Sequence, residues 1–404
     1  MKIVVLKFGG TSVGTIKKIK KVAEIITDYK KKRYNVIVVS SAMSGVTNQL
    51  IKKSNEISEN FSETEYDVLV SSGEQVACSL IAGRLNHKGY KARSWLSWQI
   101  PIITKGANKN SRISQINKNK IIKYLKNGGI PIITGFQGVN NESRITTIGR
   151  GGSDASAIMI AKFFEAKRCV IYTDVEGVYT TDPNKLKKAK KIKVISYEEM
   201  LEMASLGAKV MQPVSIQDAR LNRIDIEVRS SFVKKPGTLI TKRSNIINSR
   251  IVTGISSTQN DAKISLIGVR DKPGVAASIF KPLSKNSINV DMVVQNISAN
   301  GKETDLTFTI KTEDLNKTKK IIEANRDIKF RKLILKKNVS KISIIGVGMI
   351  TTPGVTFRMF QTLAKKRINI QVISTSEIKI SVLIDKSNIK KALFALHKEF
   401  KLDN

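Results

Sequence analysis

The sequence predicts an α/β protein: an αβα sandwich with a mostly parallel sheet, followed by two small duplicated units. Residues 1 to about 245 alternate short aliphatic runs with stretches of helical spacing. The aliphatic runs are continuous rather than alternating, as in strands that are buried on both faces. Beyond them, two segments repeat one another, which indicates a second architecture in the last part of the chain.

The elements of the first part are expected in the following order. Strand-like runs are KIVVLKF, NVIVVSSA, IPIIT near residue 101 and again from Ile130, RCVIYTD and DIEVR. Helical spacing is found over Ile16–Tyr29, Val68–Asn86, Ile113–Lys126 and Asp154–Phe164. A polar passage, KKPGTLITKRSNIINSR, then separates the predicted sandwich from the repeats.

The repeat pairs KISLIGVRDKPGVAASIFKPLSKNSINV, from Lys263, with KISIIGVGMITTPGVTFRMFQTLAKKRINI, from Lys341. Each copy reads as a strand, a Pro-Gly turn, an amphipathic helix and a strand that opens with Ile-Asn. The distance from Gly274 or Gly354 to that Ile-Asn pair is the same in both copies. We conclude that one βαβ unit occurs twice, while periodicity alone leaves open whether the units regulate or only support the fold.

The composition argues against several classes of function. The 404 residues carry a formal charge of +37, but the lysines are scattered along the chain together with many Ile and Asn. Because no groove-reading motif or aromatic-basic pattern accompanies the charge, we expect compositional drift and no nucleic-acid partner. Neither the two cysteines nor the two histidines have metal-ligand spacing. Two cysteines in a chain of this length fit a reducing cytosol. Without a signal peptide or membrane-length apolar run, we expect a cytoplasmic protein with no membrane partner.

The segment KFGGTS places a cation where the first strand ends. In parallel sheets, ligands bind beyond the carboxyl ends of the strands, where glycines let the backbone approach an anion. Lys7, Phe8, Gly9 and Gly10 occupy such an end, and Thr11 or Ser12 is a natural N-cap. Lys7 would then face a phosphate. The alternative is a strand-end lysine that extends into water.

The segment GRGGSD carries the sharpest local signal. Arg150 stands among glycines, and a guanidinium held on a glycine loop can bind a carboxylate through two hydrogen bonds. Ser153 and Asp154 then begin an apolar helix. Asp154 could equally be a plain capping residue.

Other polar groups follow predicted strands or begin helices. Ser41 and Thr47 belong to a hydroxyl-rich turn, and Glu74 begins an apolar helix, where a buried carboxylate needs a cation from a ligand or from a structural lysine. The segment YTDVEGVYTTDPN, at the end of a predicted strand, suits the rim of a site for an adenine or a ribose. Lys209, in a turn that follows a glycine, could provide a second cation for a phosphate. The sequence lacks the P-loop motif GxxxxGK[ST], the protein-kinase motifs HRD and DFG, and a GxGxxG after a strand. Any nucleotide triphosphate must therefore bind to a different kind of phosphate-binding loop.

Taken in order, these segments closely resemble the aspartate kinases of the amino acid kinase superfamily. KFGGTSV, the SxMSGVTN-type loop, SSGEQ, GFQG, GRGGSD, YTDVEGVYTTDP and SLGAKVMQP match in sequence and spacing, and the repeats resemble ferredoxin-like βαββαβ ACT units. The resemblance covers essentially the whole chain. It implies a catalytic amino acid kinase domain over 1–245, a first ACT unit over 246–335 and a second over 336–404. The first unit would be nested, with 250–260 contributing to the second.

The resemblance implies that Mg-ATP phosphorylates the β-carboxylate of L-aspartate to give L-4-aspartyl phosphate, the first step towards lysine, threonine and methionine. In this reading Arg150 binds the α-carboxylate and Glu74 the ammonium, and Asp154 orients Lys7 or the metal. Mg²⁺ is carried by ATP rather than by a protein cage. The residues implied for the nucleotide are Lys7, Phe8, Gly9, Gly10, Thr173, Asp174, Tyr179, Asp182 and Lys209, and those for the substrate are Ser41, Thr47, Glu74, Arg150, Gly151 and Ser153.

The resemblance also implies feedback control by lysine, threonine or both, in a homo-oligomer formed through the ACT units. The implied effector residues are Asp271, Gly274, Asn289, Asp291, Gln295, Thr356 and Ser376. Three other readings stay open from the residues alone. They are an amino acid kinase for a different acid, an amino acid sensor with a degenerate kinase domain, and polyanion binding driven by the charge.

Overall fold

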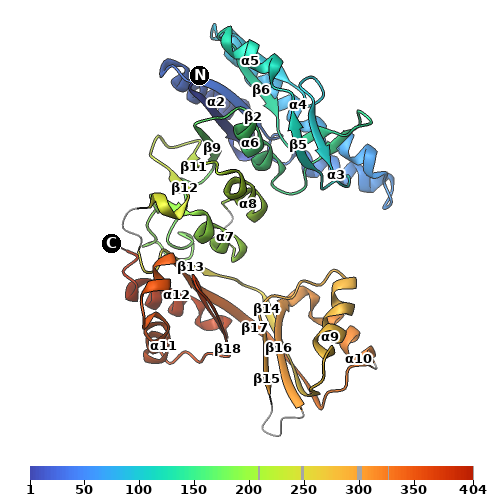
Figure 1. The fold of residues 1–404 in the computed structure, drawn as a ribbon, viewed down its shortest axis with the longest axis vertical. Coiled ribbons are helices and arrows are strands. Elements are labelled where there is room, and N and C mark those ends of the chain that lie inside the picture. The colour runs from blue at the N-terminus through green and yellow to red at the C-terminus, as the bar shows by residue number, and fades with distance from the viewer. Residues whose placement is uncertain (208–209, 247–249, 298–302, 326, 404) are drawn as a thin grey trace. The chain divides into compact units, whose positions relative to one another are not determined.

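The computed structural model describes residues 1–207, 210–246, 250–297, 303–325 and 327–403. The chain divides into two compact units (Figure 1). The first combines Met1–Tyr179 with Lys191–Asn248, and the second combines Thr180–Lys190 with Ser249–Asn404. The short segment Thr180–Lys190 therefore packs with the C-terminal part of the chain.

The first unit is built on an 8-stranded sheet. Its neighbouring strands are parallel except for the pair β11–β12, so the expected mostly parallel sheet is confirmed. In spatial order the strands are β10 (Val194–Ser196), β12 (Thr238–Thr241), β11 (Ile226–Ser230), β9 (Arg168–Thr173), β1 (Ile3–Phe8), β2 (Asn35–Ser40), β6 (Ile130–Thr134) and β3 (Ala92–Trp95).

Helices cover both faces of this sheet. The even-numbered side chains of β1, such as Leu6, share one core with the apolar faces of α2 (Ile16–Lys31) and α4 (Glu63–His87). Successive side chains of a strand point to opposite faces. Lys7 accordingly faces the other side, where α6 (Gly152–Phe163) packs. The remaining helices are α1 (Gly10–Val13), α3 (Val46–Ile57), α5 (Asn119–Lys126), α7 (Tyr197–Ser205), α8 (Pro213–Asn222) and the 3₁₀ turn η1 (Arg243–Asn245).

A second, 4-stranded sheet in this unit corrects two expectations. The helix expected over Ile113–Lys126 begins only at Asn119, because Ile113 and Ile116 belong to a strand that pairs with β4. Apolar residues three apart fit a strand with a local irregularity as well as a helix, and pairing decides between them. The first IPIIT run joins this sheet instead of the main one. The strands are β5 (Arg112–Ile116), β4 (Ile102–Lys105), β7 (Gln137–Val139) and β8 (Ile145–Thr147).

The second unit contains a 7-stranded sheet in which one long strand serves both repeats. The first half of β17 (Lys332–Ile345) pairs with β14 (Asp261–Arg270), and its second half pairs with β13 (Gly254–Ser257) and β19 (Lys379–Asp385). Each half thus completes a ferredoxin-like arrangement, and the strand-like segment before the first repeat pairs with the second. The other elements are α9 (Val275–Lys285), β15 (Val293–Ile297), β16 (Glu303–Lys311), η2 (Thr312–Asp314), α10 (Leu315–Ala324), η3 (Val347–Thr351), α11 (Val355–Lys365), β18 (Val372–Ser376), η4 (Lys386–Asn388) and α12 (Ile389–Glu399).

Among the described residues, no helix combines the length and the apolar character that crossing a membrane requires.

Candidate functional site

Lys7 forms a buried ion pair at the carboxyl end of β1. Its Nζ lies 2.6 Å from Oδ1 of Asp154, on the first turn of α6, and the two side chains are only 11% and 12% exposed. The lysine therefore does not extend into water. The pair also gives Asp154 a role beyond capping, since its carboxylate fixes the direction of the ammonium group.

The turn after Lys7 brings backbone close to the same place. Gly9 is the N-cap of α1, whereas Thr11 or Ser12 was expected. The Gly9 N–H donates to the carbonyl oxygen of Tyr172 over 3.2 Å, and the Ser12 hydroxyl donates to that oxygen over 3.3 Å. A Cβ on Gly10 would lie 2.9 Å from the carbonyl oxygen of Ala42, which explains why a glycine stands there. The turn is thus tied to β9 and to the loop after β2.

A cavity of about 600 Å³ collects most of the residues that the sequence predicted. A cavity of this size suits a small substrate together with part of a second one. The predicted residues that line it are Lys7, Gly10, Ser41, Thr47, Glu74, Arg150, Gly151, Ser153 and Asp154.

Glu74 is the most unusual group in this cavity. The residue is 3% exposed, and its Oε1 accepts the Ala42 N–H over 3.0 Å. Its Oε2 has no hydrogen-bond partner among the described residues, and no described lysine or arginine forms an ion pair with it. Burial raises the pKa of this carboxyl to about 7. A ligand that brings a cation would supply the missing partner.

Arg150 and the glycines beside it form the rim. Gly151, with φ of +76°, is the N-cap of α6, and a Cβ there would lie 2.6 Å from Cγ of Gln212. Both the positive φ and the close approach require glycine. Arg150 is exposed and lines the cavity, so its guanidinium is available to an anion.

Several residues predicted for the nucleotide do not line this cavity. The Phe8 ring is fully buried and stacks on Tyr172 with 4.9 Å between ring centroids, so only its backbone can reach a ligand. Thr173 is the last residue of β9, which pairs with β1, and Asp174 and Tyr179 follow it in the chain. The Thr173 hydroxyl donates to Asp174 over 3.0 Å. Asp182 is exposed and belongs to the second unit. Lys209 lies outside the described residues.

The sequence reasoning missed a buried carboxylate that supports the cavity wall. Asp67, on α4, is fully buried and accepts the backbone N–H groups of Lys109 and Thr147 and the Thr147 hydroxyl, the last over 2.6 Å. Lys109 and Thr147 both line the cavity. An aspartate within an apolar helical stretch is the one signal that the sequence offered. The other lining residues not predicted are Ala42, Met43, Ser44, Gly45, Asn48, Ile51, Tyr66, Phe136, Gly149 and Gly152.

Replacing Asp67 by alanine is expected to destabilise the protein. The buried Thr147 N–H and the part-buried Lys109 N–H would lose their acceptor, and each unsatisfied buried group costs about 1 to 3 kcal/mol. We therefore expect a loss of about 2 to 5 kcal/mol in the free energy of unfolding, measured by urea denaturation. Glu65→Ala, an exposed carboxylate on the same helix, should change it by less than about 1 kcal/mol. An equal loss in both variants would contradict the role of Asp67.

The residues predicted for an effector lie in the second unit. Asp271 precedes α9, and Gly274 is the N-cap of that helix. Gln295 lies on β15, Thr356 on α11 and Ser376 on β18. Asn289 is exposed, and Asp291 forms an ion pair with the buried Lys341 of β17. All seven are exposed in the single chain.

Comparisons with known proteins agree with this architecture. The amino acid kinase family model matches residues 2–230, and the ACT domain model matches 264–325 and 342–400. An aspartate kinase of Stutzerimonas stutzeri is 44% identical over 405 residues, which cover 100% of this chain and 98% of the relative. The structure of E. coli aspartokinase III in complex with lysine and aspartate (T-state) is 25% identical with a TM-score of 0.83, covering 99% of this chain and 100% of that one.

The structure of the same E. coli enzyme in complex with aspartate and ADP (R-state) has a TM-score of 0.78 at 25% identity, covering 98% of this chain and 99% of that one. The full-length matches and the two family models lead to one assignment. The chain belongs to the amino acid kinase family and, within it, to the aspartokinases, which makes it a phosphotransferase with C-terminal ACT domains.

Proposed function

We propose that the cavity behind Lys7 binds L-aspartate and presents its β-carboxylate to the γ-phosphate of Mg-ATP, giving L-4-aspartyl phosphate. One observation carries the proposal: a buried lysine, held by Asp154, and an unpartnered buried carboxylate oxygen of Glu74 line one cavity. The first group suits a phosphate and the second an ammonium. An amino acid with a reacting acid group at one end satisfies both.

The substrate is oriented by groups of opposite charge. Glu74 takes the α-ammonium, and Arg150 on the rim takes the α-carboxylate through two parallel hydrogen bonds. Ser41, Thr47, Gly151 and Ser153 supply further hydrogen bonds. The β-carboxylate is then an ionised nucleophile, and it needs no general base.

At the other end, Lys7 and the Gly10 amide stabilise the charge that spreads over the transferred phosphoryl group, while Gly9, whose N–H is held by Tyr172, contributes only the absence of a side chain. The bond between the γ-phosphorus and the ADP oxygen breaks as the bond to the aspartate oxygen forms. We place the rest of the nucleotide on Thr173, Asp174 and Tyr179, which end or follow the strand that pairs with β1, and on the Phe8 backbone. Asp182 and Lys209 stay predictions from the sequence.

The metal is proposed to arrive with the nucleotide. Among the described residues, no group of three or more His, Cys, Asp or Glu side chains could hold an ion. Single carboxylates such as Asp154 or Asp174 fit an Mg²⁺ ion that takes most of its ligands from phosphates and water. When bound, Mg²⁺ neutralises phosphate charge. We expect the reaction to take place in the cytoplasm.

Hydroxylamine trapping tests the proposed reaction. An acyl phosphate reacts with hydroxylamine to give a hydroxamate, which is detected by its colour with ferric iron. We expect hydroxamate to form only when ATP, Mg²⁺ and L-aspartate are all present, and L-glutamate to give far less. Folded protein that consumes no ATP and yields no hydroxamate under these conditions would overturn the proposal.

We propose that the second unit, divided as 246–335 and 336–404 with 250–260 shared, binds lysine, threonine or both. The relative solved with lysine and aspartate in a T-state supports an effector role for lysine. Exposed apolar residues on three strands of this unit, Val293, Ile334 and Ile373, support pairing of two chains through it. The effector would act by binding one of two conformations of the protein more tightly than the other.

Gln295→Ala is expected to weaken feedback without changing the uninhibited rate. Gln295 is exposed on β15, far in sequence from the cavity residues, so its loss removes hydrogen bonds to the effector alone. We expect the lysine or threonine concentration for half inhibition to rise about tenfold, corresponding to about 1.4 kcal/mol. Inhibition curves that coincide with those of the wild type would contradict the assignment.

A further inference from the structure

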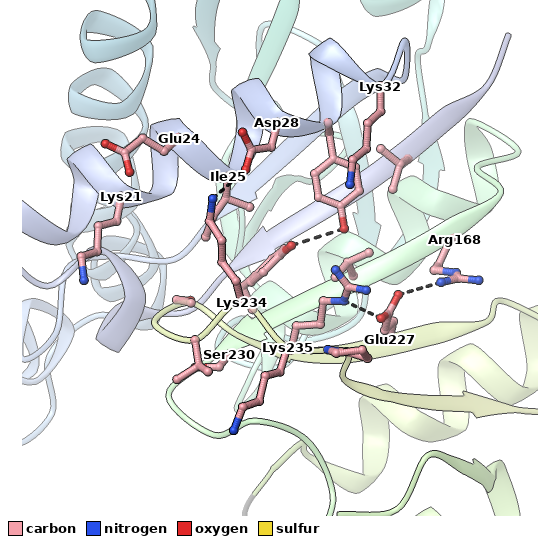
Figure 2. Close-up of a pocket in the computed structure, with 18 of the residues that line it drawn as sticks. Lys21, Glu24, Ile25, Asp28, Lys32, Arg168, Glu227, Ser230, Lys234 and Lys235 are labelled. Atoms are coloured by element: carbon pink, nitrogen blue, oxygen red, sulfur yellow. Dashed lines mark hydrogen bonds and ion pairs between the residues drawn. The ribbon is translucent and has the colours of Figure 1, made fainter.

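A second cavity, of about 620 Å³, opens in the first unit between α2 and the strands β9 and β11 (Figure 2). It shares no lining residue with the candidate site. Its volume lies within the usual range for small-molecule sites. The proposed reaction uses none of its residues.

The floor of this cavity is a charged stretch of the main sheet. On β11, Ile226 and Val228 point to the buried side, while the alternate residues Glu227 and Arg229 line the cavity. Arg229 stands beside Tyr172 of β9 in the sheet register. A sheet face covered by a helix would be apolar at these positions. Because the side chains are charged here, this part of the face suits a polar ligand.

The charges on the floor do not cancel. The Glu227 side chain is 8% exposed; one of its oxygens accepts from Arg168 over 2.7 Å, and the other accepts from Arg229. One carboxylate between two guanidiniums leaves a net positive charge in a partly dehydrated place. Lysines are abundant over the whole chain, so the excess of cations around the rim is not distinctive. The distinctive feature is a buried carboxylate, Glu227, that is held between two partly exposed guanidiniums, Arg168 and Arg229.

Two tyrosine hydroxyls lie beside these charges. The Tyr172 hydroxyl donates to the Tyr29 hydroxyl over 3.3 Å, which leaves the Tyr29 proton for another acceptor. Burial raises the pKa of both phenols, so both stay protonated at neutral pH. A guanidinium next to a hydroxyl donor suits an oxyanion. Ile25 and Phe232 add apolar surface that would accept a ring.

The cavity wall is also connected to the turn that follows Lys7. The Tyr172 carbonyl oxygen accepts from the Gly9 N–H and the Ser12 hydroxyl, and the Ser231 hydroxyl donates to Ser12 over 2.6 Å. Tyr172 and Ser231 both line the second cavity. A ligand that moves either residue would shift the glycine turn.

We propose that this cavity binds a phosphate monoester on a flat ring, with Arg229 and Tyr29 on the phosphate, and that binding alters the kinase rate through the glycine turn. The binding rests on the cavity alone, whereas its effect on rate rests on the proposed function. Lys234, which reaches towards Asp28 across the opening in Figure 2 with 3.3 Å between the charged atoms, provides a second cation.

Calorimetric titration of the full chain at constant ionic strength tests the binding. The probes are phenyl phosphate, phenol and inorganic phosphate, with AMP as a nucleotide source, titrated while aspartate and a non-hydrolysable ATP analogue fill the candidate site. We expect one phenyl phosphate per chain, bound more tightly than phenol or inorganic phosphate. AMP binding as tightly would identify a nucleotide as the source, and weaker AMP binding a non-nucleotide phosphate.

Two variants locate the site. Arg229→Met should weaken phenyl phosphate about tenfold or more. Lys234→Ala, whose side chain is 88% exposed, should weaken it a few-fold with no risk to folding. Lys126→Ala, an exposed lysine on α5 outside this cavity, is the matched control and should change nothing. Several equivalent sites per chain, or equal affinity in Lys234→Ala and in any folded Arg229→Met protein, would overturn the proposal.

The rate is measured on the same samples. Saturating phenyl phosphate should change kcat or the KM for ATP at least twofold in the wild type and not in Arg229→Met. One-to-one binding with an unchanged rate would overturn the regulatory half of the proposal. One-to-one binding to a protein that forms no hydroxamate would instead count against the proposed function and leave the site standing.

Discussion

Lys7→Ala is expected to lower kcat by about 100- to 1,000-fold, the usual effect of removing a group aimed at charge that develops in the transition state. Lys7 is the only residue at this strand end whose cation is both buried and fixed by a carboxylate among the described residues. The KM for aspartate should change little, because Glu74 and Arg150 remain. Steady-state kinetics with hydroxamate detection measures both quantities.

The same variant leaves Asp154 as a buried carboxylate without its cation. Removing one partner of a buried pair costs about 3 to 5 kcal/mol, so part of any loss could come from unfolding. The double variant Lys7→Met with Asp154→Asn removes both charges and should recover stability without recovering activity. Lys2→Ala, which removes an exposed lysine just before the same strand, serves as the control. Turnover close to that of the wild type in Lys7→Ala would remove Lys7 from the mechanism.

How far the sequence leads depends on how local each signal is. The strands β1, β2 and β9 were predictable, because each is a short, largely apolar run, rich in β-branched residues, that is typical of a strand buried on both faces. Ile113 and Ile116 were not, because their spacing fits two structures and pairing with β4 decides. The local sequence pattern thus predicts the central strands of the 8-stranded sheet but does not predict the strand β5 of the 4-stranded sheet.

The candidate site shows the same limit. Lys7 and Arg150 stand beside glycines at predicted strand or helix ends, so their neighbourhood in the sequence already indicates a ligand. Asp67 lies inside a helix, and its importance comes from Lys109 and Thr147, which reach it only in the folded chain. Glu227 and Arg229 likewise read as part of an ordinary strand until the cavity beside α2 is seen. Residues that support the candidate site, and residues that line the second cavity, can therefore be identified only from the tertiary structure.

Glu74 provides the second large prediction, through the pH dependence of substrate binding. Its carboxyl, with a pKa near 7, is largely protonated at pH 6 and cannot then attract the aspartate ammonium. The KM for aspartate should rise about tenfold for each unit of pH below 7. Glu74→Gln should raise KM about a hundredfold at pH 8, since a lost buried charge partner costs about 2 to 5 kcal/mol, and should flatten the pH profile.

The stability of the ligand-free protein gives an independent check of the same group. A carboxyl whose pKa is raised in the folded state holds its proton more tightly there than in the unfolded chain, so it lowers stability as pH rises from about 4.5 to 7. Glu74→Gln removes this penalty and should make the ligand-free protein more stable than the wild type at pH 8 but not at pH 5. Aspartate should raise the Tm of the wild type more at pH 8 than at pH 6. Glu65→Gln, on the exposed side of the same helix, should do neither. If Glu74→Gln is destabilised at pH 8 and its KM is unchanged, the carboxylate already has a partner, and the ammonium of the substrate must bind elsewhere.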